Sequence, residues 1–425
     1  MVPSALPWAL MVAAAGALTG CGSASLRTTD GGAGGKAGAT GAGGKAGGAG
    51  ADGGASCTDT TSDPNNCGAC GHSCLGGTCS TSVCQPFPLG TTTQDKADHL
   101  QLSGGMVYVL TENGATSGQT RDVWSLDAAT PSTPVEIQGA PSPSNAYPGC
   151  VMGGTLYLAP STCTVPCSLY ACSVSNCAAT SQPIVANSIS AIVAGGPYCD
   201  VANQQIVWFE ETINIVNGSI SYAVARAAVS GGSRQLITTV PITGSSTMSW
   251  RMPASTVIDS GNPDRLFYEI TDSGAHTGTL YYLSTVSPNT TLVPLATLPG
   301  IFQGGIVADD ATAIFTMFPG GTDAGAEESW AVPLPNGVTS GAPPVFSMGG
   351  AVGIVDQTSF YGLVPGSASF AADAFIRCAL PSCSNPVTLA RGQSTAQTFV
   401  EDATAVYWTT TGSGNKGFTV WKVAK

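Results

Sequence analysis

A β-hairpin pattern recurs along most of this sequence and restricts the folds available to it. Near the C-terminal end, the β-branched and aromatic run Val406–Thr409 is followed by a glycine-rich turn and a second run of the same kind at 418–423. The segment Asp402–Tyr407 matches Asp310–Phe315 and Asp356–Tyr361 position by position. Runs of β-branched and aromatic residues between turn signals indicate strands. The chain is therefore predicted to consist of repeated hairpins.

The repeat is long enough for four strands. Positions equivalent to Tyr407 recur at separations of 46 to 60 residues, and most are followed by two further apolar runs. Four strands of about six residues with their turns fit this period. The aligned anchor residues are Tyr108, Tyr157, Val207, Phe267, Phe315, Tyr361 and Tyr407. The seventh repeat lacks a fourth run, whereas an unassigned run of that kind, Gln85–Gly90, precedes the first repeat.

This exchange of one strand between the ends of the repeat region predicts a closed ring. Radially arranged four-stranded sheets protect their edges only if the last sheet is joined to the first. The predicted fold is all-β, a seven-bladed β-propeller formed by residues 85–425 and closed by an N-terminal strand. Six or eight blades are the alternatives, because one step spans 60 residues. A β-solenoid is disfavoured, since its repeats would be shorter and more uniform.

The composition agrees with an all-β fold and excludes one class of partner. Only 9% of the residues are charged, and 55 glycines and 28 prolines supply many turns, so long helices are not expected. The net charge of −12 leaves no basic cluster to neutralise phosphates. Nucleic acid is therefore not an expected partner.

The N-terminal segment reads as a targeting signal. Residues 1–20 are apolar and end in Leu18-Thr-Gly-Cys21, with no Lys or Arg before the cysteine. The segment resembles the signal peptide of bacterial lipoproteins, in which a cysteine receives diacylglycerol and becomes the first mature residue. The resemblance implies a signal peptide at 1–20, lipid attachment at Cys21, export, and anchoring to the outer membrane or cell surface. A plain secretory signal and a retained membrane helix are the alternatives.

Residues 21–56 are predicted to form a flexible tether. From Arg27 to Ser56 the chain is almost entirely glycine and alanine, with no large apolar residue after Leu26. Such a segment cannot offset the entropy of ordering. About 30 residues of this composition reach roughly 30 Å. A phosphate-binding glycine loop is disfavoured because no predicted strand precedes it and no predicted helix follows it.

Residues 57–84 form a cysteine-rich segment. The run Asn66-Cys-Gly-Ala-Cys-Gly-His-Ser-Cys74 resembles modules of exported proteins, some of them akin to the plant Stig1 type. Three disulfides are predicted, although six cysteines allow 15 pairings and the connectivity stays open. A zinc knuckle that includes His72 is the alternative, but zinc competes poorly with oxidation outside the cytoplasm. The six cysteines are Cys57, Cys67, Cys70, Cys74, Cys79 and Cys84.

Two cysteine pairs occupy equivalent turns of the repeats. Cys172 and Cys177 in repeat two, and Cys378 and Cys383 in repeat six, each enclose four residues between the third and fourth predicted strands. A turn of this length can bring the two Cα atoms within disulfide distance. Both pairs are therefore predicted to be bonded.

The remaining cysteines are assigned by position. Cys163 and Cys167 flank Thr-Val-Pro in one loop and are predicted to pair. Cys150 and Cys199 precede the anchors of adjacent repeats and are predicted to join repeats two and three. With the six of the module and the lipidated Cys21, all 15 cysteines are then accounted for.

One repeat carries a family resemblance. Val406-Tyr-Trp-Thr409 is similar to the Tyr-Trp-Thr-Asp repeat of low-density-lipoprotein-type receptor propellers, and the whole repeat looks like those of bacterial surface lipoproteins. Thr410 stands where that repeat has aspartate, and the other six repeats keep only the aromatic or β-branched character. The resemblance implies ligand binding by analogy of fold.

No catalytic motif is found. No His-Glu-x-x-His or Gly-x-Ser-x-Gly frame is present, so no catalytic residue and no metal site is assigned. The aspartates that recur in register are predicted to cap turns through Asx hydrogen bonds; they are Asp310, Asp356 and Asp402. Catalytic pairs Asp98–His99 and Asp272–His276, and a calcium site formed by Asp309–Asp310 and Glu327–Glu328, are alternatives to solvated loop residues.

Two functions of different classes follow. The favoured prediction is a non-enzymatic, monomeric surface lipoprotein, membrane-attached at Cys21, whose propeller binds a protein or glycan ligand without a cofactor. The alternative is a propeller-type hydrolase or lyase with an active site at one mouth of the central channel. Convergence of carboxylates, His or Arg at one mouth would favour the enzyme.

Overall fold

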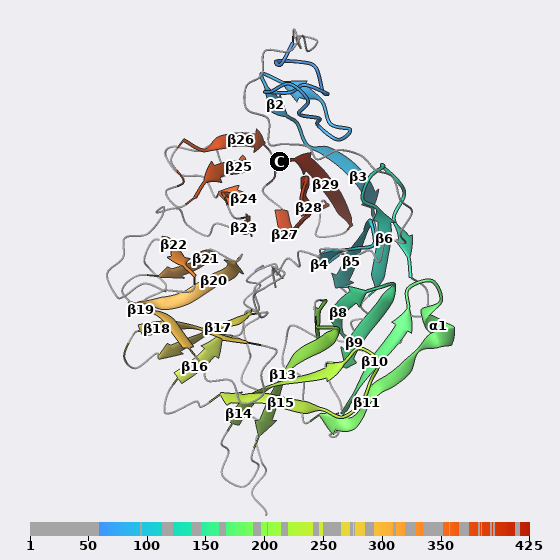
Figure 1. The fold of residues 1–425 in the computed structure, drawn as a ribbon, viewed down its shortest axis with the longest axis vertical. Helices are drawn as coiled ribbons and strands as arrows, with labels where there is room; N and C mark the ends of the chain where they lie inside the picture. The colour runs from blue at the N-terminus through green and yellow to red at the C-terminus, as the bar shows by residue number, and fades with distance from the viewer. Residues whose placement is uncertain are drawn as a thin grey trace, which may run out of the picture.

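Antiparallel sheets arranged around a common centre make up the fold (Figure 1). The computed structural model describes residues 59–425 apart from internal segments, of which the longest are 250–264 and 335–351. The prediction of an all-β propeller is confirmed. The predicted signal peptide, Cys21, the tether and Cys57 lie outside the described residues, as do Cys163 and the fourth run predicted for repeat five.

The first three sheets are four-stranded meanders, each built from one sequence repeat. Sheet 1 contains β4 (Lys96–Ser103), β5 (Met106–Glu112), β6 (Val123–Asp127) and β7 (Val135–Glu136). Sheet 2 contains β8 (Ala146–Met152), β9 (Thr155–Pro160), β10 (Cys167–Ser173) and β11 (Gln182–Ile189). Sheet 3 contains β12 (Tyr198–Asp200), β13 (Gln205–Ile213), β14 (Ile220–Ala228) and β15 (Gln235–Val240).

The next three sheets continue in chain order. Sheet 4 contains β16 (Ser246–Ser249), β17 (Arg265–Asp272), β18 (Thr277–Ser284) and β19 (Val293–Pro299). Sheet 5 has three described strands, β20 (Ile301–Ala308), β21 (Thr312–Phe318) and β22 (Glu328–Pro333). Sheet 6 contains β23 (Val352–Val355), β24 (Ser359–Val364), β25 (Ala374–Ala379) and β26 (Val387–Ala390).

Sheet 7 combines the two ends of the repeat region. It contains β27 (Ala396–Glu401), β28 (Ala405–Thr411), β29 (Phe418–Ala424) and, at its outer edge, β3 (Phe87–Thr92). The register of β29 and β3 runs from Phe418 opposite Thr92 to Lys422 opposite Phe87. The run expected to replace the missing fourth strand therefore does so, with β3 beginning and ending two residues later than the predicted segment.

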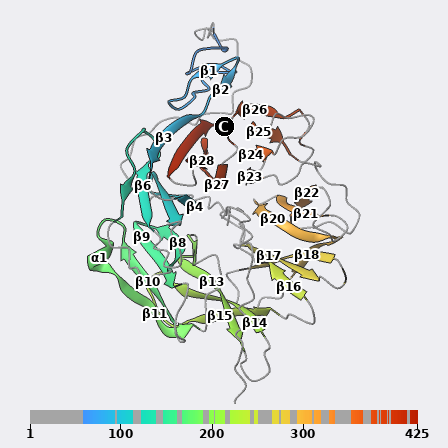
Figure 2. The same cartoon turned by 180° about the vertical axis from the view of Figure 1, so that it is seen from behind.

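The first strand of each repeat lies innermost. Contacts join β27 to β4, β4 to β8, β8 to β12, β20 to β23 and β23 to β27, all of them first strands of neighbouring sheets. The same arrangement is seen from behind (Figure 2). These strands consequently lie nearest to the centre of the ring.

The apolar core lies between neighbouring sheets. All seven aligned anchors lie on the second strand of their sheets and are at most 5% exposed, as a half-buried strand pattern requires. Between sheets 6 and 7, Phe375 stacks on Trp408 with ring centroids 4.3 Å apart, and on Phe399 at 5.9 Å. Each such pair contributes about 0.5 to 1.5 kcal/mol beyond its burial. This packing holds adjacent sheets together, along with hydrogen bonds such as those between the Gln101 side chain on β4 and the backbone of Val151 on β8.

Disulfides reinforce the turns and one junction between sheets. Cys172 is bonded to Cys177 and Cys378 to Cys383, each with Cα atoms 4.8 Å apart. Cys150 on β8 is bonded to Cys199 on β12, which links the inner strands of sheets 2 and 3. The turn that follows Cys177 forms α1 (Cys177–Thr180), a single helical turn that the sequence pattern did not predict.

The cysteine-rich module, residues 59–84 as described, contains the hairpin β1 (Cys79–Ser80) and β2 (Val83–Cys84). Its disulfides include Cys67–Cys79 and Cys74–Cys84, and Cys70 is also disulfide-bonded. The buried cysteines of the module belong to the same apolar cluster as Tyr361 and Trp408. The module is therefore packed on sheets 6 and 7. Within the described part of the chain, no helix is long and apolar enough to span a bilayer.

Candidate functional site

A group of charged side chains lies at one end of sheets 6 and 7. Asp356 directly follows β23, and Glu401 is the last residue of β27, so both stand at the ends of innermost strands. Since β28 is antiparallel to both β27 and β29, the latter two strands end at the same face. Lys425, which follows β29, is thereby brought to the two carboxylates.

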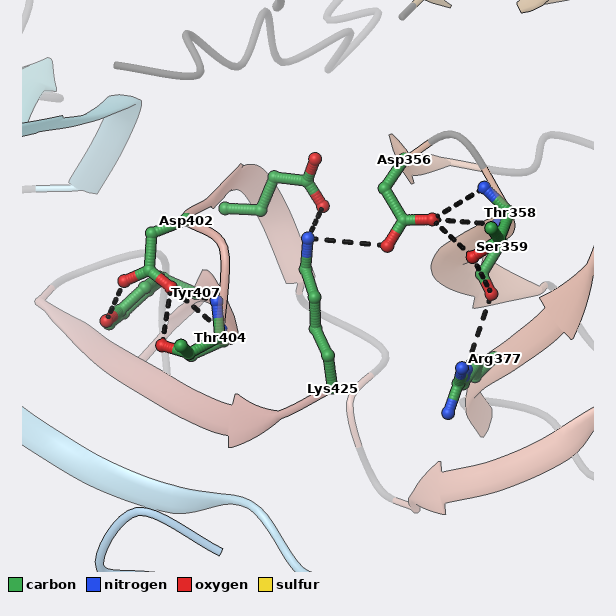
Figure 3. A network of polar contacts seen from close by, with 10 residues as sticks. Asp356, Thr358, Ser359, Arg377, Asp402, Thr404, Tyr407 and Lys425 are labelled. Atoms are coloured by element: carbon green, nitrogen blue, oxygen red, sulfur yellow. Dashed lines mark hydrogen bonds and ion pairs between the residues drawn. The ribbon is translucent and has the colours of Figure 1, made fainter. Parts of the chain in front are cut away.

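One ammonium group joins the two carboxylates. Lys425 Nζ lies 2.7 Å from Glu401 Oε2 and 3.3 Å from Asp356 Oδ2 (Figure 3). The Glu401 side chain is 1% exposed, whereas those of Lys425 and Asp356 are 13% and 14% exposed. Burial of a carboxylate at this depth requires a compensating charge. Lys425 supplies this charge and also ties sheet 7 to sheet 6.

Asp356 and Asp402 cap equivalent turns, as predicted. Asp356 Oδ1 accepts hydrogen bonds from the backbone N–H groups of Thr358 and Ser359, both at 2.9 Å. Asp402 Oδ1 accepts the same bonds from Thr404 at 2.7 Å and from Ala405 at 2.8 Å (Figure 3). These are the Asx turns expected from the recurring aspartates. Asp310, the third member of the predicted set, lies outside the described residues.

A further aspartate of this kind was missed by the sequence alignment. Asp200, at the end of β12, accepts a hydrogen bond of 3.0 Å from the backbone N–H of Asn203. It stands seven positions before its anchor Val207, whereas Asp402 stands five before Tyr407. Because this turn is two residues longer, Asp200 does not align with the recurring aspartates of the other repeats. The motif Asp-x-x-Asn was the signal that could have identified it.

The pKa values of both capping carboxyls are held below their usual range. Burial alone would raise the pKa of Asp356, but the Thr358 backbone N–H, the Lys425 ammonium and the remaining hydrogen bonds together outweigh it. For Asp402 burial is again the largest influence, and the bonds from Thr404, Tyr407 and Ala405 reverse its effect on the pKa. Both carboxyls are therefore ionised at neutral pH and in mild acid.

Sheets 6 and 7 repeat an aspartate, tyrosine and cation arrangement. Tyr407 donates a hydrogen bond of 2.8 Å to Asp402 Oδ2, and Lys422, its cross-strand neighbour, lies 5.5 Å from the ring centroid. Tyr361 has Arg377 as its cross-strand neighbour, 5.7 Å from its ring. Burial is the main cause of the raised pKa of both tyrosines. This recurrence indicates a structural role for the shared elements.

Sheet 6 departs from this repetition. The ring of Tyr361 has a second cation, Lys425, 5.8 Å from its centroid, and that lysine also brings in Glu401. An active site in a ring of similar repeats requires such a local difference. The group Asp356, Glu401 and Lys425, called the Lys425 cluster below, is the candidate site.

Sequence analysis did not identify the Lys425 cluster as a site. Asp356 was assigned only as a turn cap, and neither Glu401 nor Lys425 was noted. One signal was available, because Glu401 aligns with Val355 of the preceding repeat. A charged residue at a position that is apolar in another repeat indicates a special environment.

The alternative sites considered from the sequence receive no support. His99 lies half-buried in β4, but Asp98 is described only in its backbone, and His276, Asp309 and Glu327 lie outside the described residues. No catalytic pair or calcium site can therefore be assembled from them.

The zinc alternative is disfavoured by the chemistry of its donors. The Sγ atoms of Cys67, Cys74 and Cys84 lie within 4.8 Å of one another, yet all three are bonded in disulfides. Disulfide sulfur is not the thiolate that zinc requires. The ring nitrogens of His72 are turned to the carbonyl oxygens of Cys67 and Lys425.

Comparison with known proteins shows similarity in structure alone. No family model and no curated protein matches the sequence. The uncomplexed acylaminoacyl peptidase of Pyrococcus horikoshii matches with a TM-score of 0.50 at 8% identity, over 78% of this chain and 52% of that one. The β-propeller domain of the Trilobed protease from Pyrococcus furiosus matches with a TM-score of 0.46 at 9% identity, over 79% and 94%.

A further match is to a structure from a study of two prolyl endopeptidases, with a TM-score of 0.49 at 10% identity, over 79% of this chain and 47% of that one. This chain thus spans about half the length of the acylaminoacyl and prolyl peptidases. At such identities the acylaminoacyl peptidase match shows the propeller fold and nothing finer.

These comparisons correct the functional prediction. The solved structure that matches with a TM-score of 0.50 is a peptidase, which contradicts the expectation of a non-enzymatic binding protein and fits the hydrolase alternative better. The prediction that the chain is not an enzyme is corrected with it. The physical reason for the error is that the recurring aspartates were assigned to turns alone, whereas the ring brings one of them to a lysine and a second carboxylate.

Proposed function

We propose that this chain is a propeller-type hydrolase whose active site is the Lys425 cluster. The observation that carries the proposal is a single ammonium group between carboxylates from two neighbouring sheets, each at the C-terminal end of its sheet's first strand. Peptides are the first substrate class to consider, because the solved structure that matches with a TM-score of 0.50 is a peptidase.

Each member of the cluster has a distinct role in this proposal. Asp356, held ionised and 14% exposed, takes a proton from water as that water attacks the substrate carbonyl. The ammonium of Lys425 faces the negative charge that develops on the carbonyl oxygen. Asp356 then returns the proton to the leaving amine. Glu401, 1% exposed, does not meet substrate and is a positioning residue for Lys425.

The ring that supports this site is proposed to have seven blades and to be closed through β3. Support comes from the seven sheets of three or four strands among the described residues, and from the contacts between their first strands. The pairing of β3 with β29 supplies the outer strand of sheet 7 from the other end of the repeats. Such a closure would fix the distance between sheets 6 and 7, and hence the geometry of the cluster.

Peptide cleavage by the purified protein tests the proposed activity. The full chain is incubated with a defined peptide mixture between pH 4 and 8, and products are identified by mass spectrometry. Because general base catalysis contributes about 10²-fold or more, Asp356→Asn should reduce the cleavage rate by roughly that factor. Cleavage should persist in mild acid, since the low pKa of Asp356 keeps its carboxylate ionised there.

The matched control is Asp402→Asn. It changes the same residue type in the equivalent Asx turn of sheet 7, where the bonding partners of the Asp402 carboxylate are Thr404, Ala405 and Tyr407. This variant should cleave within about twofold of the unchanged protein. Absence of cleavage by the unchanged protein, or equal loss in both variants, would exclude the Lys425 cluster as a catalytic site.

Export and lipid anchoring are proposed on sequence grounds. The support is the apolar segment that ends in Leu18-Thr-Gly-Cys21, followed by a glycine-rich tether and a disulfide-rich module, a combination suited to an oxidising compartment. Mass spectrometry of the mature protein should find an acylated Cys21 at the N-terminus, and Cys21→Ser should release the protein from membranes. Recovery of an intact, unmodified Met1 would contradict lipidation.

A further inference from the structure

We propose that His72 is a protonation-dependent latch that docks the cysteine-rich module on the propeller and fixes the backbone of Lys425. The latch deepens the proposed function, since Lys425 is the residue that bridges the two carboxylates of the candidate site. It concerns two parts of the chain, residues 72 and 425, that lie 353 positions apart.

The contacts of His72 require a charged ring. Its Nδ1 lies 2.5 Å from the carbonyl oxygen of Cys67, and its Nε2 lies 2.7 Å from the carbonyl oxygen of Lys425. A carbonyl oxygen can only accept hydrogen bonds, so each nitrogen must carry a proton. Neutral imidazole has one N–H, whereas the imidazolium has two. Only the protonated ring makes both contacts, and bonds from a charged donor are the stronger kind.

The latch acts on a backbone position that is held from both sides. The N–H of Lys425 donates a hydrogen bond of 3.0 Å to Thr404 O, and its carbonyl oxygen accepts the bond from His72. The side chain of the same residue then reaches Glu401 and Asp356. Fixing the backbone of the residue that follows β29 limits motion that would otherwise let the ammonium move away from the carboxylates.

Apolar contacts keep the module in place when the latch opens. Leu75 packs against the core between sheets 6 and 7 and also against the core between sheets 7 and 1. The buried Cys67, Cys74 and Cys84 belong to the first of these cores. Loss of one hydrogen bond from His72 therefore loosens the C-terminal backbone without releasing the module or unfolding a sheet.

The other charged groups on the elements packed against His72 are already engaged. In the module, Asp59 accepts bonds from Thr61 and Ser62, and Asp63 accepts bonds from Asn65 and Asn66. On the propeller, the Lys425 ammonium is paired with its two carboxylates. Protonation of His72 is thus coupled to the two hydrogen bonds that its ring nitrogens donate to the main-chain oxygens of Cys67 and Lys425. The latch is closed while the ring carries both protons and opens when one of them is lost.

Hydrogen exchange of the Lys425 amide in the full chain tests the latch. After correction for the intrinsic pH dependence of exchange, the amide should open about tenfold more often at pH 8.5 than at pH 5.5, a ratio typical of losing one charge-assisted hydrogen bond. The variant His72→Gln has a neutral side chain at both pH values and should show no such ratio. The amide of Trp208, in sheet 3, serves as the internal control and should not respond to pH or to the variant.

The result that would overturn the latch is the same pH ratio in the unchanged protein and in His72→Gln, or no ratio in either. The exchange measurement is independent of hydrolysis, so the two proposals fail separately. If peptides are cleaved, the variant should also lose the part of the kcat pH profile that falls between pH 5.5 and 8.5. A residue with a merely structural role would lower kcat equally at all pH values.

Discussion

Deletion of residues 1–93 should give a protein that aggregates or melts far below the full chain, whereas deletion of 1–56 should leave the melting temperature unchanged. The longer deletion removes β3, which pairs with β29 from Phe418 to Lys422 and buries Leu89 to 1% exposure. Burial of Leu89 contributes roughly 1.5 to 3 kcal/mol, and each ladder hydrogen bond about 1 kcal/mol. The summed loss of roughly 5 kcal/mol or more is comparable with the whole stability of many domains.

An intermediate deletion separates the strand from the module. Removal of 1–84 takes away the module but keeps β3, so it should lower the melting temperature less than removal of 1–93. Circular dichroism and size-exclusion chromatography follow the three proteins. The exposed edge of β29 should appear as concentration-dependent association in the longest deletion alone. If the 1–84 and 1–93 deletions melt alike, β3 does not close the ring.

The substitution Lys425→Met should destabilise the protein by roughly 3 kcal/mol or more, because it leaves the buried carboxylate of Glu401 without its counter-charge. Methionine keeps most of the apolar volume of the lysine stem, so the loss reports on the charge. Restoring neutrality with Glu401→Gln in the same chain should recover most of this stability, to within about 1 kcal/mol of the unchanged protein.

A double-mutant cycle measures this coupling. Urea unfolding of the two single variants, the double variant and the unchanged protein gives the interaction free energy between Lys425 and Glu401. Arg377→Met is a suitable comparison, because Arg377 also lies over the ring of Tyr361 but its guanidinium donates to the Ser359 hydroxyl and forms no ion pair with a carboxylate within the part of the chain that the structure describes. A double variant no more stable than Lys425→Met would show that Glu401 is not held by the lysine.

The strands were predictable because their signals are local. Alternation of β-branched and aromatic residues between glycine-rich turns placed all seven anchors on second strands, where they are buried. The same holds for Cys172–Cys177 and Cys378–Cys383, since a short turn leaves few other partners within reach. Asp356 and Asp402 were predictable as turn caps, because an Asx turn involves only the two or three residues that follow.

The candidate site was not predictable by such reasoning. Asp356, Glu401 and Lys425 are 45 and 24 positions apart along the chain, and each is an ordinary residue in its own turn or strand end. Their meeting depends on β27 and β29 ending at one face and on sheet 6 lying beside sheet 7. The contact from His72 to Lys425 depends in addition on where the module packs.

The sequence by itself determined the period, the strands, the short disulfides and the need for one strand to pass from the N-terminal side to the last sheet. Each of these follows from backbone preference or from the rule that sheet edges must be covered, and both act over a few residues or over one repeat. Only the tertiary structure decided which charges meet. Electrostatic contacts depend on distances of a few ångströms, and those distances are set by the packing of one sheet against the next, because no local pattern encodes them.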